Sequence, residues 1–408
     1  MLSLRLTRPL TSASRSFATS AFALAHHRIV VVGAGTAGVT VAAQLKRASG
    51  IIKDGDIAII DPSTRHDYQP GWTLVGSGLA KLEDMHKPTA EVVPKGATLI
   101  AESVETFEPE RNAVKTKSGE EITYDYLVVA PGLKINFGGI PGLVEGLSDP
   151  TGPVSSIYSY ENAEKTFTNV KNLKSGTAIF TQPAGVIKCA GAPQKVMWMA
   201  LSTWKKAGVR DAIDIGFLTG MPAMFAVPKY AKALNALREK RGVEGLFATN
   251  LVSIDNANRT ATFAQADGCK IDRKFDLLHA VPPQGPLDFI KNSPIADAVG
   301  WVSVDSKTTQ HTKYPNIFAL GDGSSLPTSK TAAAISAQAP VLVDNLLAYM
   351  EGKPLLAQYD GYTSCPLLTG HNELMLAEFK YAAEPKESFA WIMGSQDKPR
   401  YLFYLLKK

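Results

Sequence analysis

Short runs of apolar residues, each followed by a turn of small residues, mark the expected strands of this chain. The first run covers 27–32, and a helix-compatible segment follows at 39–48. Later runs, with their turns, lie at 57–61, 124–132, 176–181, 214–219 and 314–323. Continuously apolar strands that alternate with helical segments are typical of an α/β fold.

A glycine motif of the form G-x-G-x-x-G joins the first expected strand to the first expected helix. Gly33, Gly35 and Gly38 allow a tight turn and a close approach of the backbone to a pyrophosphate, which then sits at the helix N-terminus. The second strand ends at Asp61, about where an acid hydrogen-bonds an adenosine ribose. Together these features predict a dinucleotide-binding site.

Two further segments resemble the flavoproteins that contain two dinucleotide-binding domains. In that family the segment matching 124–132 crosses between domains, and the aspartate matching Asp322 in 314–323 binds the ribityl chain of FAD. A small-residue helix begins within 329–334, and its N-terminus and Lys330 would stabilise negative charge on a reduced flavin; simple close packing of its alanines is the alternative. The resemblance implies an α/β fold of tandem Rossmann-like domains of the disulfide-oxidoreductase flavoprotein type, with FAD as the cofactor.

The expected domain order interrupts the FAD-binding domain with a second Rossmann-like domain, which carries Cys189. The boundaries are 1–25 for a presequence, 26–155 and 291–350 for the two parts of the FAD-binding domain, 156–290 for the second domain, and 351–408 for a C-terminal region. The C-terminal region carries Cys365 and a membrane-facing segment.

The second domain lacks a complete nucleotide-binding fingerprint. Its first strand, 176–181, is followed by a turn in which Gly185 is the only glycine before Cys189. The next strand ends in Thr219-Gly220 rather than in an acid or a basic cluster. Because both the pyrophosphate cradle and the ribose anchor are degraded, we expect this NAD site to be degenerate.

The chain has three cysteines, and their surroundings differ. Cys189 lies between Lys188 and Lys195, ahead of a helix expected from Gln194, and both cations and a helix N-terminus favour the reactive thiolate. Cys365 lies in an expected turn-rich loop, where the residues alone leave a reactive and a structural role equally open.

The third cysteine, Cys269, follows an Asp-Gly turn between two expected strands. This position predicts a surface hairpin residue. The three cysteines lie far apart in the sequence, and their spacings match no metal site.

Four motifs give the chain a close resemblance to the mitochondrial sulfide:quinone oxidoreductases, from about residue 28 to the end. The motifs are KCAGAPQK at 188–195, YTSCPL at 362–367, YQPGWTL at 68–74 and LPTSKTAA at 326–333. In this family the two cysteines are joined in the resting enzyme, commonly through a bridging sulfur.

The resemblance implies a reaction in two stages. Hydrosulfide attacks the sulfur on the residue matching Cys365, leaves a persulfide there and releases the thiolate matching Cys189. That thiolate adds to the flavin or forms a charge-transfer complex with it, and two electrons pass to FAD. Glutathione or sulfite takes the sulfane sulfur, the cysteine bridge closes, and the reduced flavin reduces ubiquinone.

The same matching implies the positions of the cofactor-binding residues. Gly35 and Thr36 would lie on the FAD pyrophosphate, Asp61 on the adenosine ribose, and Gln69 near the flavin. Val104, in an expected strand over 103–107, would hold the adenine edge through its backbone. The set is completed by Lys195, Asp322, Lys330, Thr331, Ala332 and Ala333.

Composition and charge narrow the location and the partners. The 408 residues suit two or three domains. Residues 1–25 contain Arg5, Arg8 and Arg15 but no acid, which predicts a mitochondrial presequence, with a disordered arm as the alternative. Without these arginines the formal net charge falls from +5 to +2, which argues against nucleic acid as a partner.

The segment 401–408 resembles the start of the aromatic and basic C-terminal segment with which the family docks on the membrane. With the presequence, it implies a peripheral protein of the mitochondrial inner membrane whose anchor or quinone pocket is in part missing. A helix packed on the core is the alternative reading, and no stretch reaches the roughly 18 apolar residues that span a bilayer.

Two other functions stay open from the sequence. An NADH:quinone or NADH:acceptor oxidoreductase of the same superfamily would have to bind NADH at the degraded fingerprint. A flavin-bound scaffold or sulfur carrier without turnover would have no need of two such cysteine motifs. Sulfide oxidation through Cys189 and Cys365 is therefore the leading hypothesis.

Overall fold

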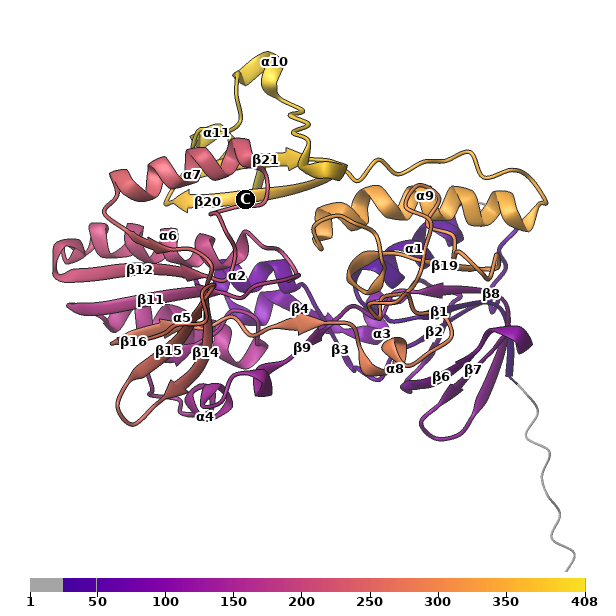
Figure 1. Cartoon of the computed structure of the whole chain (residues 1–408). Helices are drawn as coiled ribbons and strands as arrows, with labels where there is room; N and C mark the ends of the chain where they lie inside the picture. Colours follow the sequence, from indigo (N-terminus) through magenta and orange to yellow (C-terminus); the bar gives the residue numbers. More distant parts are fainter. Residues whose placement is uncertain (1–24, 49, 408) are drawn as a thin grey trace, which may run out of the picture.

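The computed structural model of the chain describes residues 25–48 and 50–407 (Figure 1). The predicted presequence, 1–25, therefore lies outside the described residues except for its last position. The α/β prediction is confirmed, since two separate sheets with helices on their faces stand side by side (Figure 1). The domain boundaries stay a prediction.

The first sheet is formed by the segments on either side of the second one. Its order is β5-β2-β1-β8-β7-β6, with β19 also paired to β8. The bounds are β1 (Ala25–Val32), β2 (Ile57–Ile60), β5 (Thr98–Ile100), β6 (Val104–Glu108), β7 (Ala113–Thr116), β8 (Glu121–Val129) and β19 (Ile317–Ala319).

Helices α1 (Thr36–Ala48) and α9 (Ala332–Met350) lie together on one face of this sheet (Figure 1). The side chains of 29–32 are buried on both faces of β1, which explains their continuously apolar sequence. The predicted helix over 39–48 is confirmed, although it begins earlier, at Thr36.

The second sheet is parallel and has the order β10-β17-β11-β12-β13. Its bounds are β10 (Val154–Ser155), β11 (Gly176–Gln182), β12 (Ile213–Thr219), β13 (Glu244–Leu246) and β17 (Leu277–His279). The helices of this region are α5 (Tyr160–Asn172), α6 (Ala192–Lys206) and α7 (Pro228–Lys240). Trp198 and Trp204 of α6 are buried in the largest apolar cluster of this region, so α6 is fixed against the sheet.

Shorter elements connect or border the two sheets. An antiparallel three-stranded sheet consists of β14 (Thr249–Asp255), β15 (Thr260–Gln265) and β16 (Lys270–Lys274). The other short elements are α2 (Trp72–Val75), α3 (Thr89–Val92), α4 (Leu143–Ser148), α8 (Asp288–Lys291), and the paired strands β3 (Arg65–Asp67) with β4 (His86–Pro88) and β9 (Lys134–Ile135) with β18 (Gln284–Gly285). Cys269 lies exposed in the turn between β15 and β16, which confirms the predicted hairpin position.

The C-terminal region lies across the top of both sheets in Figure 1. It contains the hairpin of β20 (Thr363–Gly370) and β21 (Glu373–Phe379), followed by α10 (Ala390–Met393) and α11 (Tyr401–Lys407). Phe403 of α11 is buried against Met199 of α6 and Leu368 of β20, so α11 packs on the core with one side. No helix among 25–48 and 50–407 is long and apolar enough to cross a membrane.

Candidate active site

A cavity of about 530 Å³ lies where the two sheets and the C-terminal hairpin meet. Most residues predicted for the cofactor and for the reaction line it: Gly33, Gly35, Thr36, Asp61, Gln69, Cys189, Lys195, Asp322, Lys330, Thr331, Ala332 and Ala333. Gly38, Val104 and Cys365 do not line it. Val104 begins β6 and is buried in the core below the sheet, and its predicted backbone contact with adenine stays a prediction.

The glycine turn after β1 leaves open space where a dinucleotide would lie. A Cβ on Gly33 would meet the carbonyl oxygen of Ala130. A Cβ on Gly38 would meet the carbonyl oxygen of Gly33, so both glycines allow tight internal packing. A Cβ on Gly35, in contrast, would meet no atom within 4 Å, and Gly35 faces the cavity. This open position fits the close approach of a pyrophosphate to the backbone.

Asp61 follows β2 and is oriented toward the glycine turn by two backbone hydrogen bonds. Its Oδ2 accepts from the N–H of Ala34 at 2.7 Å, and its Oδ1 accepts from the N–H of Ser63 at 2.8 Å. Each carboxylate oxygen has a second lone pair, so the side chain can also accept from a ribose hydroxyl.

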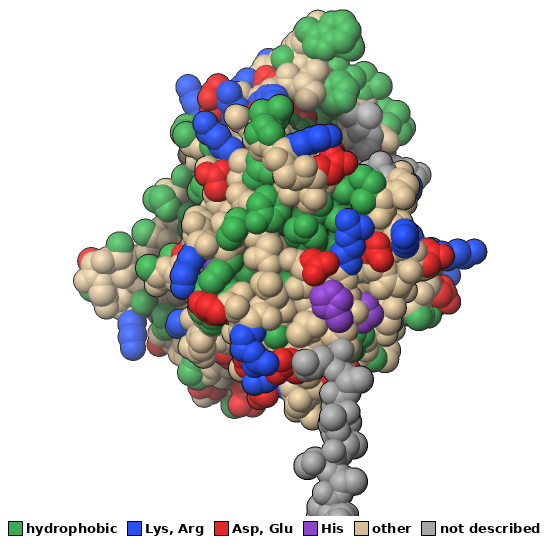
Figure 2. All heavy atoms as spheres, turned by 90° about the vertical axis from the view of Figure 1, so that its right-hand side faces the viewer, with side chains coloured by type: hydrophobic (Ala, Val, Ile, Leu, Met, Phe, Trp, Pro, Cys, Tyr) green, Lys and Arg blue, Asp and Glu red, His purple; other side chains and the backbone are tan. Residues whose placement is uncertain are grey.

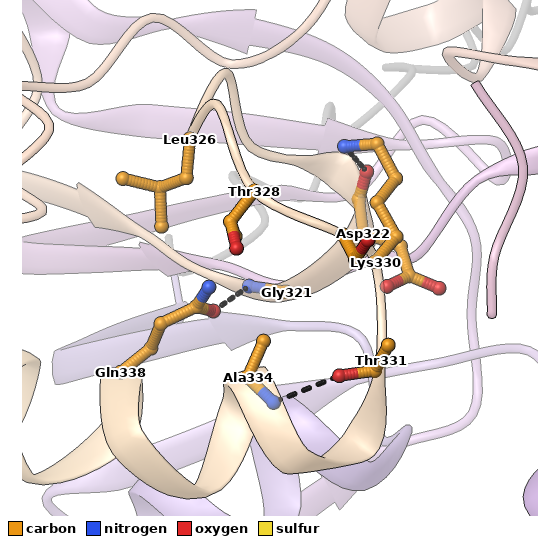
Figure 3. A pocket seen from close by; sticks show the side chains of 9 residues that line it. Gly321, Asp322, Leu326, Thr328, Lys330, Thr331, Ala334 and Gln338 are labelled. Atoms are coloured by element: carbon orange, nitrogen blue, oxygen red, sulfur yellow. Dashed lines mark hydrogen bonds between the residues drawn. The ribbon is translucent and has the colours of Figure 1, made fainter. Parts of the chain in front are cut away.

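The other end of the cavity is formed by Asp322, Lys330 and the N-terminus of α9 (Figure 3). Thr331 caps α9, because its Oγ1 accepts from the N–H of Ala334 at 2.9 Å. The first N–H groups of a helix carry partial positive charge, and Ala332 and Ala333 border the cavity at this point. The helix end therefore favours an anionic group there.

Lys330 is held in place by three contacts. Its Nζ donates to the carbonyl oxygens of Asp322 (2.6 Å) and Ser324 (3.1 Å) and lies 3.9 Å from the ring centre of Trp301. Burial lowers the pKa of Lys330 to about 8 even though the Asp322 carboxylate acts in the opposite direction, and burial raises the pKa of Asp322. The carbonyl contact between Lys330 and Asp322 is drawn in Figure 3.

The two predicted cysteines meet beside this cavity. Their Sγ atoms lie 4.0 Å apart although they are separated by 176 positions in the sequence. Cys189 adopts a left-handed backbone conformation (φ 48°), its N–H donates to the carbonyl oxygen of Lys330 at 2.7 Å, and the hydroxyl of Tyr158 donates to the carbonyl oxygen of Lys188 at 3.1 Å. These backbone contacts fix the position of the sulfur at the cavity.

Cys365 lies in a strand, so the predicted turn-rich loop is wrong at this position. It pairs with Ala377 across the β20–β21 hairpin, and its side chain is 2% exposed. Its neighbours in the core include Phe225 and Leu367. The sequence suggested a loop because Pro366 lies within the strand and prolines are rare in sheets.

Gly191 provides the space in which the two sulfurs approach each other. A Cβ at this position would meet Sγ of Cys365 and the side chain of Leu367. Helix α6 begins at Ala192, two residues earlier than predicted, and the N–H of Ala192 donates to the carbonyl oxygen of Cys189 at 2.7 Å. The sulfur pair therefore lies at the N-terminus of α6.

Lys195 extends from the first turn of α6 to the sulfur pair. Its Nζ lies 3.3 Å from Sγ of Cys189, and the residue is 3% exposed. Burial lowers the pKa of the Lys195 ammonium, but the Cys189 and Cys365 thiolates outweigh burial and leave the pKa raised. The expectation that Lys195 contacts a bound cofactor stays a prediction.

Three residues at the site were not predicted as site residues. The Nζ of Lys188 donates to Oε1 of Gln69 at 2.5 Å and lies 5.3 Å from the ring centre of Trp72. Burial lowers the pKa of Lys188 to about 8. Lys188 could have been inferred because it is the neighbour of Cys189, and Trp72 because it lies near Gln69 in the sequence. Tyr158 also lines the cavity, but no local sequence pattern distinguishes it.

In the second sheet, the turn after β11 corresponds to the glycine turn after β1, and it is closed by the protein's own backbone. A Cβ on Gly220, after β12, would meet the backbone of Ala184, which lies in the turn after β11. The N–H of Ala184 donates to Oδ1 of Asn250 at 3.0 Å. A turn whose backbone N–H is already hydrogen-bonded and whose glycine packs against backbone is poorly suited to bind a pyrophosphate. No cluster of potential metal ligands occurs within the described part of the chain.

Comparisons with known proteins agree with this arrangement. Residues 27–339 match the pyridine nucleotide-disulphide oxidoreductase family. The chain is 47% identical to a mitochondrial sulfide:quinone oxidoreductase of Schizosaccharomyces pombe, over 99% of this chain and 93% of that protein. It is 48% identical to a protein of the same description from Dictyostelium discoideum, over 93% and 83%.

A solved structure shows the same fold. It is the sulfide:quinone oxidoreductase of Aquifex aeolicus, at 22% identity, with a TM-score of 0.75 over 89% of this chain and 85% of that chain. The fold of the chain is therefore the Rossmann-type fold of this oxidoreductase family.

Proposed function

The chain belongs to the sulfide:quinone oxidoreductases, and from this premise we propose that Cys189 and Cys365 pass electrons from sulfide to a bound FAD. It is an oxidoreductase of a flavoprotein family that oxidises sulfide with quinone as the electron acceptor. The single observation that carries the proposed mechanism is the 4.0 Å approach of two distant cysteine sulfurs beside the dinucleotide cavity.

The sulfur half of the reaction begins from a bridge between the two cysteines. Written for a disulfide, hydrosulfide forms a bond to Sγ of Cys365, the bond to Cys189 breaks, and the electron pair leaves on Sγ of Cys189. A nucleophilic acceptor, glutathione or sulfite, then removes the outer sulfur from Cys365. Closing the bridge from the two thiolates releases two electrons.

The cavity fits FAD as the group that takes these electrons. Gly35, Thr36 and Asp61 would hold the pyrophosphate and the ribose, and Asp322 and the N-terminus of α9 would face the ribityl chain and the ring. Bound FAD supplies a two-electron acceptor that a quinone can reoxidise. The partial positive charge at α9 and the Lys330 ammonium would stabilise an anionic ring.

The quinone substrate connects the protein to a membrane, and two short helices support peripheral attachment. On α10 and α11 the large apolar side chains of Trp391, Ile392 and Leu402 are 84%, 62% and 55% exposed. Hydrophobic side chains gather at the top of Figure 2, the height at which Figure 1 shows α10. Such side chains fit the headgroup region of a bilayer, here the mitochondrial inner membrane.

Membrane attachment can be tested apart from the sulfur chemistry. Flotation with vesicles of inner-membrane lipid composition should carry the parent protein and leave behind a Trp391→Ser/Ile392→Ser variant. A matched variant, Val299→Ser, removes an exposed apolar side chain from the loop after α8 and should float normally. Equal flotation of all three proteins would contradict attachment through α10.

The reaction is tested by sulfide-dependent reduction of a short-chain ubiquinone with FAD-loaded protein, in the presence of a sulfur acceptor such as glutathione. The parent should turn over, while Cys189→Ser and Cys365→Ser should lose activity and Cys269→Ser should keep it. NADH without sulfide should leave the flavin oxidised, because the second nucleotide turn is closed. Flavin bleaching by NADH and none by sulfide would favour the NADH oxidoreductase alternative.

A further inference from the structure

Lys188 lines the cofactor cavity from the loop that precedes α6, together with Gln69, Trp72 and Tyr158. Its Nζ donates to Oε1 of Gln69 at 2.5 Å and lies 5.3 Å and 6.0 Å from the ring centres of Trp72 and Tyr158. Because the Gln69 amide is neutral, this hydrogen bond orients the ammonium but does not balance its charge.

The backbone of Lys188 is fixed on both sides. Its N–H donates to Oε1 of Gln284 at 2.9 Å, and its carbonyl oxygen accepts from the hydroxyl of Tyr158 at 3.1 Å. An isolated parallel bridge also links Lys188 to Lys330, which lies just ahead of α9. The ammonium is therefore held at the cavity by a fixed backbone, as a preorganised charge requires.

No carboxylate contacts the Lys188 ammonium. Across residues 25–48 and 50–407 it takes part in no ion pair with an acid, and Asp322 and Asp67 act on it from beyond ion-pair distance. Burial lowers the pKa of Lys188 to about 8, so most of the group is still protonated at pH 7. A cation shielded from water without a partner is costly, and a negative ligand in the cavity would relieve this cost.

The indole N–H of Trp72 also lacks a partner at this place. Trp72 is 6% exposed, and its Nε1 donates to no acceptor in the described part of the chain. Most buried N–H groups in proteins are paired, and Trp72 lines the cavity beside Lys188. An unsatisfied donor and an unbalanced cation thus lie together, and both favour a ligand that carries acceptor atoms and negative charge.

We propose that Lys188 stabilises the negative charge of the reduced cofactor ring and so raises the reduction potential of the bound flavin. This inference rests on the proposed function, in which FAD occupies the cavity with its ring near Gln69. Positive charge beside a ring that takes up two electrons and one proton favours the anionic product. The Lys330 ammonium already donates to two carbonyl oxygens of the protein, whereas Nζ of Lys188 uses one of its three N–H bonds on Gln69.

The reduction potential of the bound flavin, measured against a reference dye, tests this inference. All proteins carry Cys189→Ser, so that no bridge to Cys365 forms and the flavin is the two-electron centre that titrates. Lys188→Gln removes the charge and keeps a donor for Gln69, and Lys188→Met removes both. In each, the equilibrium constant for reduction should fall at least about tenfold, which lowers the potential by about 30 mV.

Two control variants separate this charge from general effects of substitution. Lys188→Arg keeps the charge and should stay closer to the parent than either neutral variant. Lys134→Met removes an exposed lysine that pairs with Asp288 at 2.6 Å and precedes Ile135, which lines the same cavity. Because the Lys134 charge is exposed and paired, its removal should leave the potential unchanged.

Cofactor binding provides a second measurement of the same quantity. The Kd for oxidised FAD and the Kd for dithionite-reduced FAD are determined with the apoprotein of each variant. By linkage, the neutral variants at Lys188 should weaken the binding of reduced FAD at least about tenfold more than the binding of oxidised FAD.

The outcomes separate this inference from the function on which it rests. Equal potentials in the parent, Lys188→Gln and Lys188→Met would overturn the role of Lys188, as would an equal fall in Lys134→Met. A parent that binds no FAD would instead overturn the proposed function. Circular dichroism and the flavin spectrum identify a variant that has not folded or loaded, and either neutral variant alone suffices for the test.

Discussion

The backbone N–H of Cys189 donates a 2.7 Å hydrogen bond to the carbonyl oxygen of Lys330. This bond joins the loop after β11 of the second sheet to the residue that precedes the cap of α9 on the first sheet. The neighbouring Lys188 also forms an isolated parallel bridge with Lys330. The backbone of Cys189 is thus bonded to the segment that leads into α9, whose N-terminus borders the same cavity.

Gly191→Ala should separate the two sulfurs. The added methyl group would meet Sγ of Cys365 and the side chain of Leu367, so the hairpin must shift, at a cost of about 1–3 kcal/mol in the free energy of unfolding. We expect the quinone reductase activity to fall at least about tenfold, because a small displacement of reacting groups has a large effect on rate. Gly285→Ala, where a Cβ meets nothing within 4 Å, is the control. Normal activity in Gly191→Ala would contradict this account of the sulfur pair.

Gly35→Ala should weaken cofactor binding and leave the fold intact. Its Cβ would project into open space at the cavity, where the pyrophosphate would lie, so we expect the Kd for FAD to rise by about tenfold, or about 1.4 kcal/mol. Gly38→Ala should destabilise the protein itself, because its Cβ would meet the Gly33 carbonyl. FAD titration and chemical unfolding of the apoprotein distinguish the two effects, and the reverse pattern would contradict the assigned cradle.

His279 should make the fold sensitive to acid. Burial lowers its pKa to about 3, and its Nε2 accepts from the N–H of Ile157 at 3.1 Å. Protonation of His279 in the folded protein would break that hydrogen bond and place a charge in a buried site. As the pH falls below 6.5, the ordinary histidine pKa, His279 is therefore protonated in the unfolded chain before it is protonated in the folded one. The free energy of unfolding should therefore fall as pH falls from 6.5 toward 3, by about 2 kcal/mol between pH 7 and pH 5. In urea unfolding, His279→Gln should show a smaller loss over this range, and an equal loss would argue against a buried neutral histidine.

Glu378→Gln should loosen the segment that carries α10 and α11. The buried carboxylate of Glu378 accepts from the hydroxyl of Tyr362 (2.5 Å), the N–H of Ser388 (2.9 Å) and Nε2 of Gln396 (2.8 Å). The amide in the Glu378→Gln variant can make only some of these hydrogen bonds. The lost bonds should lower the free energy of unfolding by about 1–3 kcal/mol. Limited proteolysis should then cut between 385 and 400 faster than in the parent. Glu384→Gln, which removes an exposed ion pair with Lys380, should behave like the parent.

The nucleotide turn could be predicted because its information is local. The strand before Gly33, the helix after Gly38 and the acid at Asp61 follow one another within a short stretch of sequence, and each has a fixed backbone requirement. The structure places Gly33, Gly35 and Asp61 at one cavity. The two lysines near Cys189, Lys188 and Lys195, were likewise visible in the neighbouring positions of the sequence.

The remainder of the site depends on contacts that no local pattern encodes. Cys365 was expected in a loop, but the pairing of β20 with β21 offsets the unfavourable effect of Pro366 in the strand. The hydroxyl of Tyr158 reaches the backbone of Lys188 from 30 positions away. Its contact follows from the packing of the region that includes α6 rather than from its own neighbours in the sequence.

Rapid mixing of FAD-loaded protein with sulfide and a sulfur acceptor such as glutathione, in the absence of quinone, tests the central claim most directly. If Cys189 and Cys365 together deliver electrons from sulfide to the flavin, the flavin absorbance should bleach in the parent and in Cys269→Ser. It should stay unchanged in Cys189→Ser and in Cys365→Ser. Bleaching in either of these two variants at the rate of the parent would show that sulfide reaches the flavin without the sulfur pair, and would contradict the account.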